Sequence, residues 1–179
     1  MNTDVMFSSA YDAWATPQAF FDELDKKYDF DIDVCAEDHT AKCATYWTIL
    51  DDCLSIDWKS YGDLHFDASP TCYMNPPYGR EIGKFIKKAY EESIKGCEVI
   101  CLLPARTDTK WFHEYCTKGE ITFLKGRLIF GTDEYWQWVW NEEILNGKKN
   151  SLYKKFGKKN SAPFPSMVVV FNPRRKNML

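Results

Sequence analysis

The four residues Asn75-Pro76-Pro77-Tyr78 carry more chemical information than any other short segment of this chain. They follow a short apolar stretch at residues 72–74 and precede a helix-like run that begins at Arg80. This places them at the carboxyl end of an expected strand, where open α/β sheets bind their ligands. Because proline has a fixed φ and no backbone donor, we expect a stiff loop that presents one amide, one backbone carbonyl and one aromatic ring.

A loop of this kind suits the exocyclic amine of a nucleobase. The lone pair of such an amine is delocalised into the ring, so the amine is a poor nucleophile until acceptors draw its two N–H bonds out of the ring plane. Asn75 offers its side-chain carbonyl and Pro76 its backbone carbonyl, while Tyr78 can stack on the base. These groups would act as preorganised dipoles. The alternative is that the tetrapeptide is only a rigid turn.

Two further segments predict strands that would position this loop. Residues 30–35 alternate between apolar and polar side chains, which is typical of a strand, and a carboxylate-rich loop follows them. Residues 99–103 form a near-continuous apolar run, which is typical of a central strand buried on both faces. Since parallel strands end at the same edge of a sheet, the loops at residues 33–36 and 75–78 would border one crevice.

The alternation of strands and helices predicts an α/β protein with a doubly wound, mainly parallel sheet covered on both faces. Helices are expected at 17–28, 80–95 and 109–116, with Thr16 as the N-cap of the first and Gly96 after the second. Residues 40–62 look irregular, with a short strand near 46–49 and a loop at Asp57 and Trp58. The last strands, expected at 120–124, 127–130 and 167–171, are candidates for antiparallel pairing.

Length and composition favour one domain over residues 1–179. The chain is 45% hydrophobic, and residues 131–165 break the strand–helix pattern like an insertion. No apolar run approaches the length of a membrane span, and the first residues lack the pattern of a signal peptide. We therefore expect a cytoplasmic protein.

The cysteine pattern favours reduced, buried thiols. The chain has seven cysteines, and three of them, Cys72, Cys97 and Cys101, stand in apolar surroundings. Cys35, His39, Cys43 and Cys53 contain no Cys-x-x-Cys pair, and their spacing matches no common zinc site. We expect no bound metal.

Charge is distributed unevenly along the chain. Residues 1–67 carry 15 acidic and 4 basic side chains, whereas residues 147–179 carry 9 basic and no acidic ones. Paired lysines with aromatic residues between them suit contact with a phosphate backbone, although a solvated loop would have the same composition. The paired lysines proposed for this contact are Lys148, Lys149, Lys154, Lys155, Lys158 and Lys159.

A series of motifs in a fixed order carries a family resemblance. They are Trp14-Ala15-Thr16-Pro17, residues 30–36, Lys42-Cys43, Asp57-Trp58, residues 75–79, residues 103–109, Trp111-Phe112-His113, residues 126–130 and residues 162–166. In this arrangement the chain resembles the phage-type, Dam-related DNA N6-adenine methyltransferases, which use S-adenosylmethionine. The resemblance covers most of the chain. It implies the Rossmann-like fold of methyltransferases that use this cofactor, and it implies a phage or prophage origin.

The resemblance also implies roles for individual residues. The catalytic loop would be Asn75, Pro76, Pro77 and Tyr78, acting on an adenine that is flipped out of the DNA stack. The cofactor would contact Trp14, Thr16, Pro17, Asp33, Cys35, Ala36, Asp57, Trp58 and Asn75. Arg106 and Arg127 are expected to contact DNA phosphates or base edges, unless they pair with internal carboxylates.

Target recognition is expected in residues 131–165. Its first half contains Tyr135, Trp136, Trp138 and Trp140, which would otherwise form a satellite hydrophobic cluster. Three other functions remain open from the sequence: methylation of cytosine N4, methylation of RNA bases or of a glutamine side chain, and DNA binding without catalysis. Neither the recognition sequence nor the oligomeric state follows from these motifs.

Overall fold

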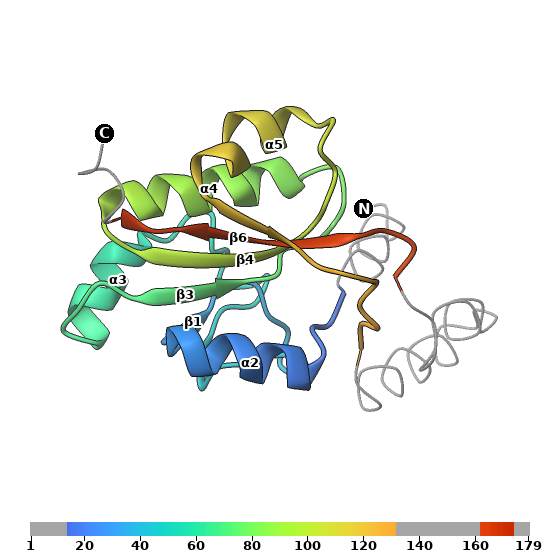
Figure 1. Cartoon of the computed structure of the whole chain (residues 1–179). Helices are drawn as coiled ribbons and strands as arrows, with labels where there is room; N and C mark the ends of the chain where they lie inside the picture. Colours follow the sequence, from blue (N-terminus) through green and yellow to red (C-terminus); the bar gives the residue numbers. More distant parts are fainter. Residues whose placement is uncertain (1–13, 132–161, 174–179) are drawn as a thin grey trace, which may run out of the picture.

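A computed structural model describes residues 14–131 and 162–173 of the chain (Figure 1). These residues form an α/β fold around one six-stranded mixed sheet, in the order β2-β1-β3-β4-β6-β5. The helices are α2 (Gln18–Tyr28), α3 (Trp58–His65), α4 (Ile82–Lys95), α5 (Lys110–Glu114) and the 3-10 helix η1 (Cys116–Lys118). The strands are β1 (Ile32–Asp33), β2 (Thr45–Tyr46), β3 (Thr71–Met74), β4 (Glu98–Pro104), β5 (Glu120–Phe123) and β6 (Ser166–Phe171).

The sheet is parallel on one side and mixed on the other. β1 pairs in parallel with both β2 and β3, and β3 pairs in parallel with β4. β6 runs antiparallel between β4 and β5, so the expected α/β class with an antiparallel final strand is confirmed. From β1 the chain passes to β2 on one side and then to β3 on the other. The loops that follow β1 and β3 therefore leave the sheet side by side.

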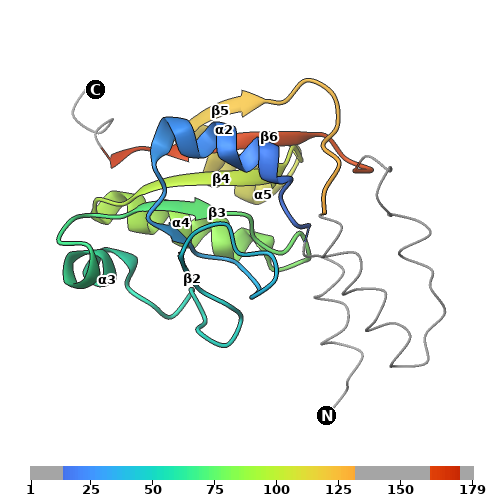
Figure 2. The same ribbon diagram turned by 90° about the horizontal axis from the view of Figure 1, so that it is seen from below.

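Helices cover both faces of the sheet. α2 lies on one face, and α4 and α5 lie on the other, as two views at right angles show (Figures 1 and 2). α4 buries Ile82, Ile86 and Ala89, whose spacing of four and three residues places them on one side of a helix. β4 is buried from Val99 to Pro104, which explains its unbroken apolar sequence.

The chain between residues 47 and 70 is more regular than expected. Instead of a loop at Trp58, the helix α3 begins there, and the side chain of Asp57 caps it by accepting the backbone N–H of Ser60 at 2.8 Å. Gly62 lies in the middle of this helix, where glycine has a low helix propensity. A larger residue would not fit, because a Cβ atom at this position would come 2.3 Å from Cδ of Pro70.

Two other expectations were wrong. Residues 127–130 form no strand, and β5 pairs with β6 rather than with them. Thr16 is not the N-cap of α2: the helix begins at Gln18, Pro17 occupies the cap position, and no side chain caps it. The hydroxyl of Thr16 turns toward the end of β3 instead.

The cysteines are free thiols, and those expected in the core are there: Cys72, Cys97 and Cys101 are fully buried. Within the described ranges, no three His, Cys, Asp or Glu side chains form a group that could hold a metal ion. None of the helices in these ranges is long and apolar enough to cross a membrane.

Candidate active site

Asn75 stands directly after β3, and its side chain is held from two directions. The amide nitrogen donates to the backbone carbonyl of Trp14 at 2.5 Å and to Oγ1 of Thr16 at 3.0 Å. The Trp14 carbonyl can only accept, so this contact determines which end of the amide is the nitrogen. The segment before α2 therefore orients the first residue of the predicted catalytic loop.

The other end of the same amide has no partner. Oδ1 of Asn75 is buried from solvent and accepts no hydrogen bond in the part of the chain that the structure describes. Burying an acceptor without a donor costs about 1–3 kcal/mol, and native proteins rarely accept this cost without a functional reason. Residues 14–131 and 162–173 thus hold one buried acceptor for a donor that none of them supplies.

Thr16 links Asn75 to the sheet. Its Oγ1 lies 2.6 Å from the phenol oxygen of Tyr73, and both groups are buried. Tyr73 is on β3, and its ring packs edge-on against Phe21 and Phe30. Tyr73, Thr16 and Asn75 therefore form a continuous hydrogen-bonded chain that ends at the unpaired oxygen.

Tyr78, the last residue of the loop, is only 3% exposed. Its hydroxyl donates to the carbonyl of Leu102 on β4 at 3.1 Å. Its ring meets Phe130 and Phe164 edge-on, with centroids 6.1 and 5.4 Å away. Burial raises the pKa of Tyr78, so its phenol stays protonated and keeps this bond. The hydroxyl bond thus fixes the orientation of the Tyr78 ring, and neighbouring residues cover the ring from solvent.

Asp33 organises the neighbouring loop from inside. It is 3% exposed, and its register partner across β1 and β3 is Tyr73. Its two carboxylate oxygens accept the backbone N–H groups of Cys35 at 3.3 Å and Lys42 at 3.1 Å. Burial raises the pKa of Asp33 to about 6, although these two bonds oppose that shift. The carboxylate ties two parts of the loop together.

Cys35 and Ala36 continue this loop next to residues 47–53. The backbone N–H of Ala36 donates to the carbonyl of Trp47 at 2.9 Å. The sulfur of Cys35 lies 3.7 Å from the sulfur of Cys53. Burial raises the pKa of the Cys35 thiol, which therefore stays protonated. Trp47 and Cys53 therefore both contact the predicted cofactor loop.

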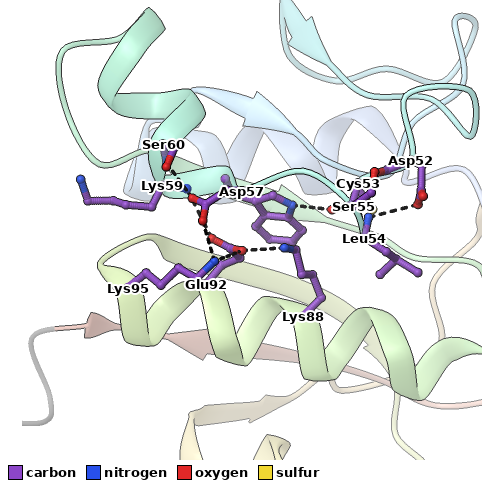
Figure 3. A network of polar contacts seen from close by, with 11 residues as sticks. Asp52, Cys53, Leu54, Ser55, Asp57, Lys59, Ser60, Lys88, Glu92 and Lys95 are labelled. Carbon is purple, nitrogen blue, oxygen red and sulfur yellow. Dashed lines mark hydrogen bonds and ion pairs between the residues drawn. The ribbon is translucent and has the colours of Figure 1, made fainter.

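Asp57 lies away from this group. Besides capping α3, its carboxylate accepts a hydrogen bond from Nζ of Lys95 at 2.8 Å (Figure 3). Lys95 is in the last turn of α4, just before β4 starts, so this contact is at the amino edge of the parallel strands. The bond to Lys95 holds the pKa of Asp57 below its usual range.

Trp58 is fully buried beside Asp57. Its Nε1 donates to the carbonyl of Cys53 at 2.8 Å, and Nζ of Lys88 lies 5.9 Å from its ring. A side chain with no exposed surface offers no face for stacking on a ligand in this arrangement. The structure therefore brings Trp14, Thr16, Asp33 and Asn75 together and leaves Asp57 apart from them. Trp58 lies behind the Asp33 loop, because Trp47 and Cys53, which contact its side chain, also contact that loop.

The two predicted arginines are exposed. Arg106 follows the end of β4, and its positive charge partly opposes the rise in the pKa of Tyr78. Arg127 donates from Nη1 to the carbonyl of Ala162 at 3.2 Å. The recognition aromatics (Tyr135, Trp136, Trp138, Trp140) and the paired lysines (Lys148, Lys149, Lys154, Lys155, Lys158, Lys159) lie outside the described residues.

Sequence reasoning missed two features of the site. The sequence predicts Tyr73 only as part of a short apolar strand, although it stands two residues before Asn75, a spacing that puts two side chains on the same face of an extended chain. Phe130 and Phe164, which both contact Trp14 and Tyr78, were noted only as parts of motifs. The two-residue spacing between Tyr73 and Asn75 is the sequence feature that indicates that both side chains lie at the site.

Comparison with known proteins gives a consistent result. The family described as DNA N-6-adenine-methyltransferase (Dam) matches residues 5–178. The DNA N-6-adenine-methyltransferase of Haemophilus phage HP1 (strain HP1c1) is 29% identical over 178 residues, which cover 94% of this chain and 92% of that protein. The protein of the same name from Escherichia phage T1 is 30% identical over 124 residues, 68% of this chain but 48% of the phage protein.

Proposed function

The chain belongs to the DNA N-6-adenine-methyltransferase (Dam) family, and on this premise we propose that it transfers a methyl group from S-adenosylmethionine to N6 of adenine in DNA. The observation that supports this most directly is the buried Oδ1 of Asn75, which has no hydrogen-bond partner among the described residues. An exocyclic amine is the kind of donor that this oxygen lacks. We propose in addition that the α/β sheet is the Rossmann-like fold of methyltransferases that use this cofactor.

The residues around the β1 loop fit such a cofactor. S-adenosylmethionine carries a sulfonium and an ammonium group against one carboxylate, so it is a net cation at neutral pH. Residues 14–67 hold 13 acidic and 4 basic side chains, and this surplus attracts a cation. We propose that Trp14, Thr16, Pro17 and the loop formed by Asp33, Cys35 and Ala36 hold it. When bound, the cofactor supplies an electrophilic methyl group.

The contribution of the chain to the reaction is orientation and polarisation. Oδ1 of Asn75 accepts one N–H of the adenine amine, and the backbone carbonyl of Pro76 accepts the other. Both acceptors draw the hydrogens out of the ring plane, which concentrates the nitrogen lone pair toward the methyl group. With S-adenosylmethionine bound, the N–C bond would form as the S–C bond breaks, S-adenosylhomocysteine would leave, and the methylated amine would release one proton to water. Pro77 keeps the loop stiff throughout.

The target adenine must leave the duplex to reach Asn75. We propose that it stacks on Tyr78. Because Tyr78 is 3% exposed, stacking requires the groups that cover its ring to shift. Its hydroxyl bond to Leu102 would hold the plane of the ring while they move. Entry of the base is then coupled to a rearrangement around Phe130 and Phe164, which contact the ring and each other.

DNA contacts are proposed from charge and position. Arg106 is exposed just after β4, close enough for its charge to act on Tyr78, and it would contact phosphate beside the flipped base. Arg127 and the six paired lysines at 148–159 would add further phosphate contacts, and residues 131–165 would read the sequence. The phage sources of both relatives favour action on DNA inside a bacterial host cell.

The test is mass spectrometry of nucleosides after incubation of the protein with duplex DNA and isotopically labelled cofactor. We expect labelled N6-methyladenine, formed about 10²–10³-fold more slowly by the Asn75→Ala variant. Labelled N4-methylcytosine would show that the substrate base is cytosine and not adenine. Label in RNA or protein, or no label at all, would contradict the proposal, the last outcome in favour of a DNA-binding protein without catalysis.

A further inference from the structure

Tyr73 carries a hydroxyl that its packing does not require. The residue is on β3, its ring lies against Phe21 and Phe30, and it is 1% exposed. A phenylalanine would fill the same space, so the phenol oxygen contributes something other than packing. A buried tyrosine hydroxyl needs a hydrogen-bond partner, and here that partner is Oγ1 of Thr16 at 2.6 Å.

The direction of one bond in this chain follows from the groups involved. The amide nitrogen of Asn75 can only donate, so Thr16 accepts from it. Between Thr16 and Tyr73, either hydroxyl can be the donor. When Thr16 donates to the phenol oxygen, its only proton is used in that bond, and Oγ1 of Thr16 faces Asn75 as an acceptor alone.

This arrangement has a consequence for the amide of Asn75. While its proton is held by the phenol oxygen of Tyr73, Thr16 acts toward Asn75 only as an acceptor. Without the phenol, the Thr16 hydroxyl could rotate and donate to Oδ1 of a flipped Asn75 amide. A flipped amide would present N–H groups to an incoming amine, and two donors facing each other repel. The bond to the Trp14 carbonyl opposes this flip, so the effect is partial.

We propose that Tyr73 is a positioning residue for methyl transfer, which acts through Thr16 to keep Oδ1 of Asn75 directed at the substrate amine. This rests on the proposed function, and it adds a residue outside the Asn75-Pro76-Pro77-Tyr78 loop. Tyr73 touches neither substrate nor cofactor in this account. Its role is to hold the orientation of the group that does.

The first experiment is the Tyr73→Phe variant, which keeps the ring and removes the hydroxyl. We expect kcat, per folded molecule, to fall about tenfold, which corresponds to about 1.4 kcal/mol of lost transition-state stabilisation. The KM for the cofactor should change less than about twofold, since an interaction of the transition state alone is lost. Tyr90→Phe on α4 is the matched control, because its ring packs on Tyr115 and Phe171, away from the site.

The second experiment separates positioning from core packing. Thr16→Val removes the hydroxyl that joins Tyr73 to Asn75, and Thr16→Ser keeps it. If Tyr73 acts through Thr16, Tyr73→Phe should change kcat less than about twofold in the Thr16→Val background, and about tenfold in the Thr16→Ser background. A role in packing alone would give the same loss in both backgrounds.

The possible results have distinct meanings. A wild-type protein that methylates adenine, together with a Tyr73→Phe variant of unchanged kcat, overturns this inference and leaves the proposed function intact. An undiminished effect of Tyr73→Phe in the Thr16→Val background overturns it as well. A wild-type protein without any methylation of DNA overturns the proposed function, and this inference with it.

Discussion

Two buried polar clusters lie at opposite edges of the sheet, and they differ in how completely they are satisfied. At the amino edge, the fully buried carboxylate of Glu92 accepts from Nζ of Lys88 at 2.6 Å, from Nζ of Lys95 at 2.9 Å and from the backbone N–H of Lys59 at 3.3 Å (Figure 3). At the carboxyl edge, the side chain of Asn75 is bonded through its nitrogen, and its buried oxygen has no partner in the part of the chain that the structure describes.

The difference separates a structural from a functional use of polar groups. Glu92 joins α3 to α4, and a buried charge is tolerable there because cations and an N–H group surround it. Asn75 joins the N-terminal segment to β3 but keeps one oxygen unpaired, at a cost in stability. Variants at the first cluster should therefore change stability and leave activity, whereas variants at the second should do the reverse.

The largest expected effect is that of Asn75→Ala. Loss of the oriented acceptor should lower kcat by about 10²–10³-fold, as loss of one preorganised group does in other enzymes. The free energy of unfolding should change little, because removal of an unpaired buried oxygen offsets the loss of two hydrogen bonds. Turnover on DNA and urea unfolding measure the two quantities.

Asn75→Asp sharpens this prediction. It keeps an acceptor but replaces the N–H group that binds the Trp14 carbonyl, so the side chain should lose its orientation and kcat should fall as well. Near-normal turnover of either variant would contradict the role of the oriented oxygen.

Glu92→Gln should give the opposite pattern. It leaves Lys88, whose side chain is 14% exposed, without its carboxylate, and breaking a buried ion pair from one side costs about 3–5 kcal/mol. The exposed side of Lys95 can regain water, which places the expected loss at the lower end of this range. The kcat per folded molecule should stay within about twofold of wild type.

The matched control is Glu91→Gln on the same helix. Glu91 pairs with Lys87 at 3.7 Å, and both side chains are about half exposed, so the variant should lose less than about 0.5 kcal/mol. A large loss of turnover in folded Glu92→Gln would show that the two clusters are coupled, and the proposed separation would be wrong.

Asp33 belongs to the carboxyl edge but is satisfied, and its prediction concerns pH. Its pKa of about 6 in the folded protein exceeds the ordinary 3.8, so folding favours its protonated form. Its contribution to stability is therefore full below pH 3.8 and is lost as pH rises through 6. Two pKa units correspond to at most about 3 kcal/mol.

The measurement is the free energy of unfolding of wild type minus that of Asp33→Asn between pH 4 and 7.5. This difference should fall as pH rises, because only the wild type titrates at this position. A difference that rises with pH would mean that the bonds from Cys35 and Lys42 outweigh burial, and that the carboxylate is stabilised in its charged form.

Much of this arrangement could be predicted from local sequence, and the rest could not for identifiable reasons. The apolar run of β4 and the loop at Asn75 follow from composition and proline chemistry. Thr16 has the residue type of an N-cap, but the sequence does not show that Asn75 and Tyr73 both form hydrogen bonds with its hydroxyl. Leu128, Ile129 and Phe130 are apolar like a strand, yet Leu128 accepts from the backbone of Ala162, 34 positions later. Only the fold brings such pairs together.

Asp57, next to the Glu92 cluster, is a second residue whose contacts could not be predicted from the sequence. Its substitution has the smallest expected effect. The family resemblance implies a cofactor contact for Asp57, whereas its observed bonds cap α3 and hold Lys95. If the structural role is the main one, Asp57→Ala should lower the free energy of unfolding by about 1 kcal/mol, as loss of an N-cap does. Cofactor affinity, measured by calorimetry, should stay within about twofold of wild type.

Asp63→Ala is the comparison for Asp57→Ala, because Asp63 pairs with Lys59 on the same helix but caps nothing. It should cost less than Asp57→Ala, since an exposed ion pair contributes at most about 1 kcal/mol. A tenfold loss of cofactor affinity in Asp57→Ala alone would place Asp57 in the binding site. The cofactor would then extend along residues 47–57 from one edge of the sheet toward the other, and the two clusters would no longer be separate in function.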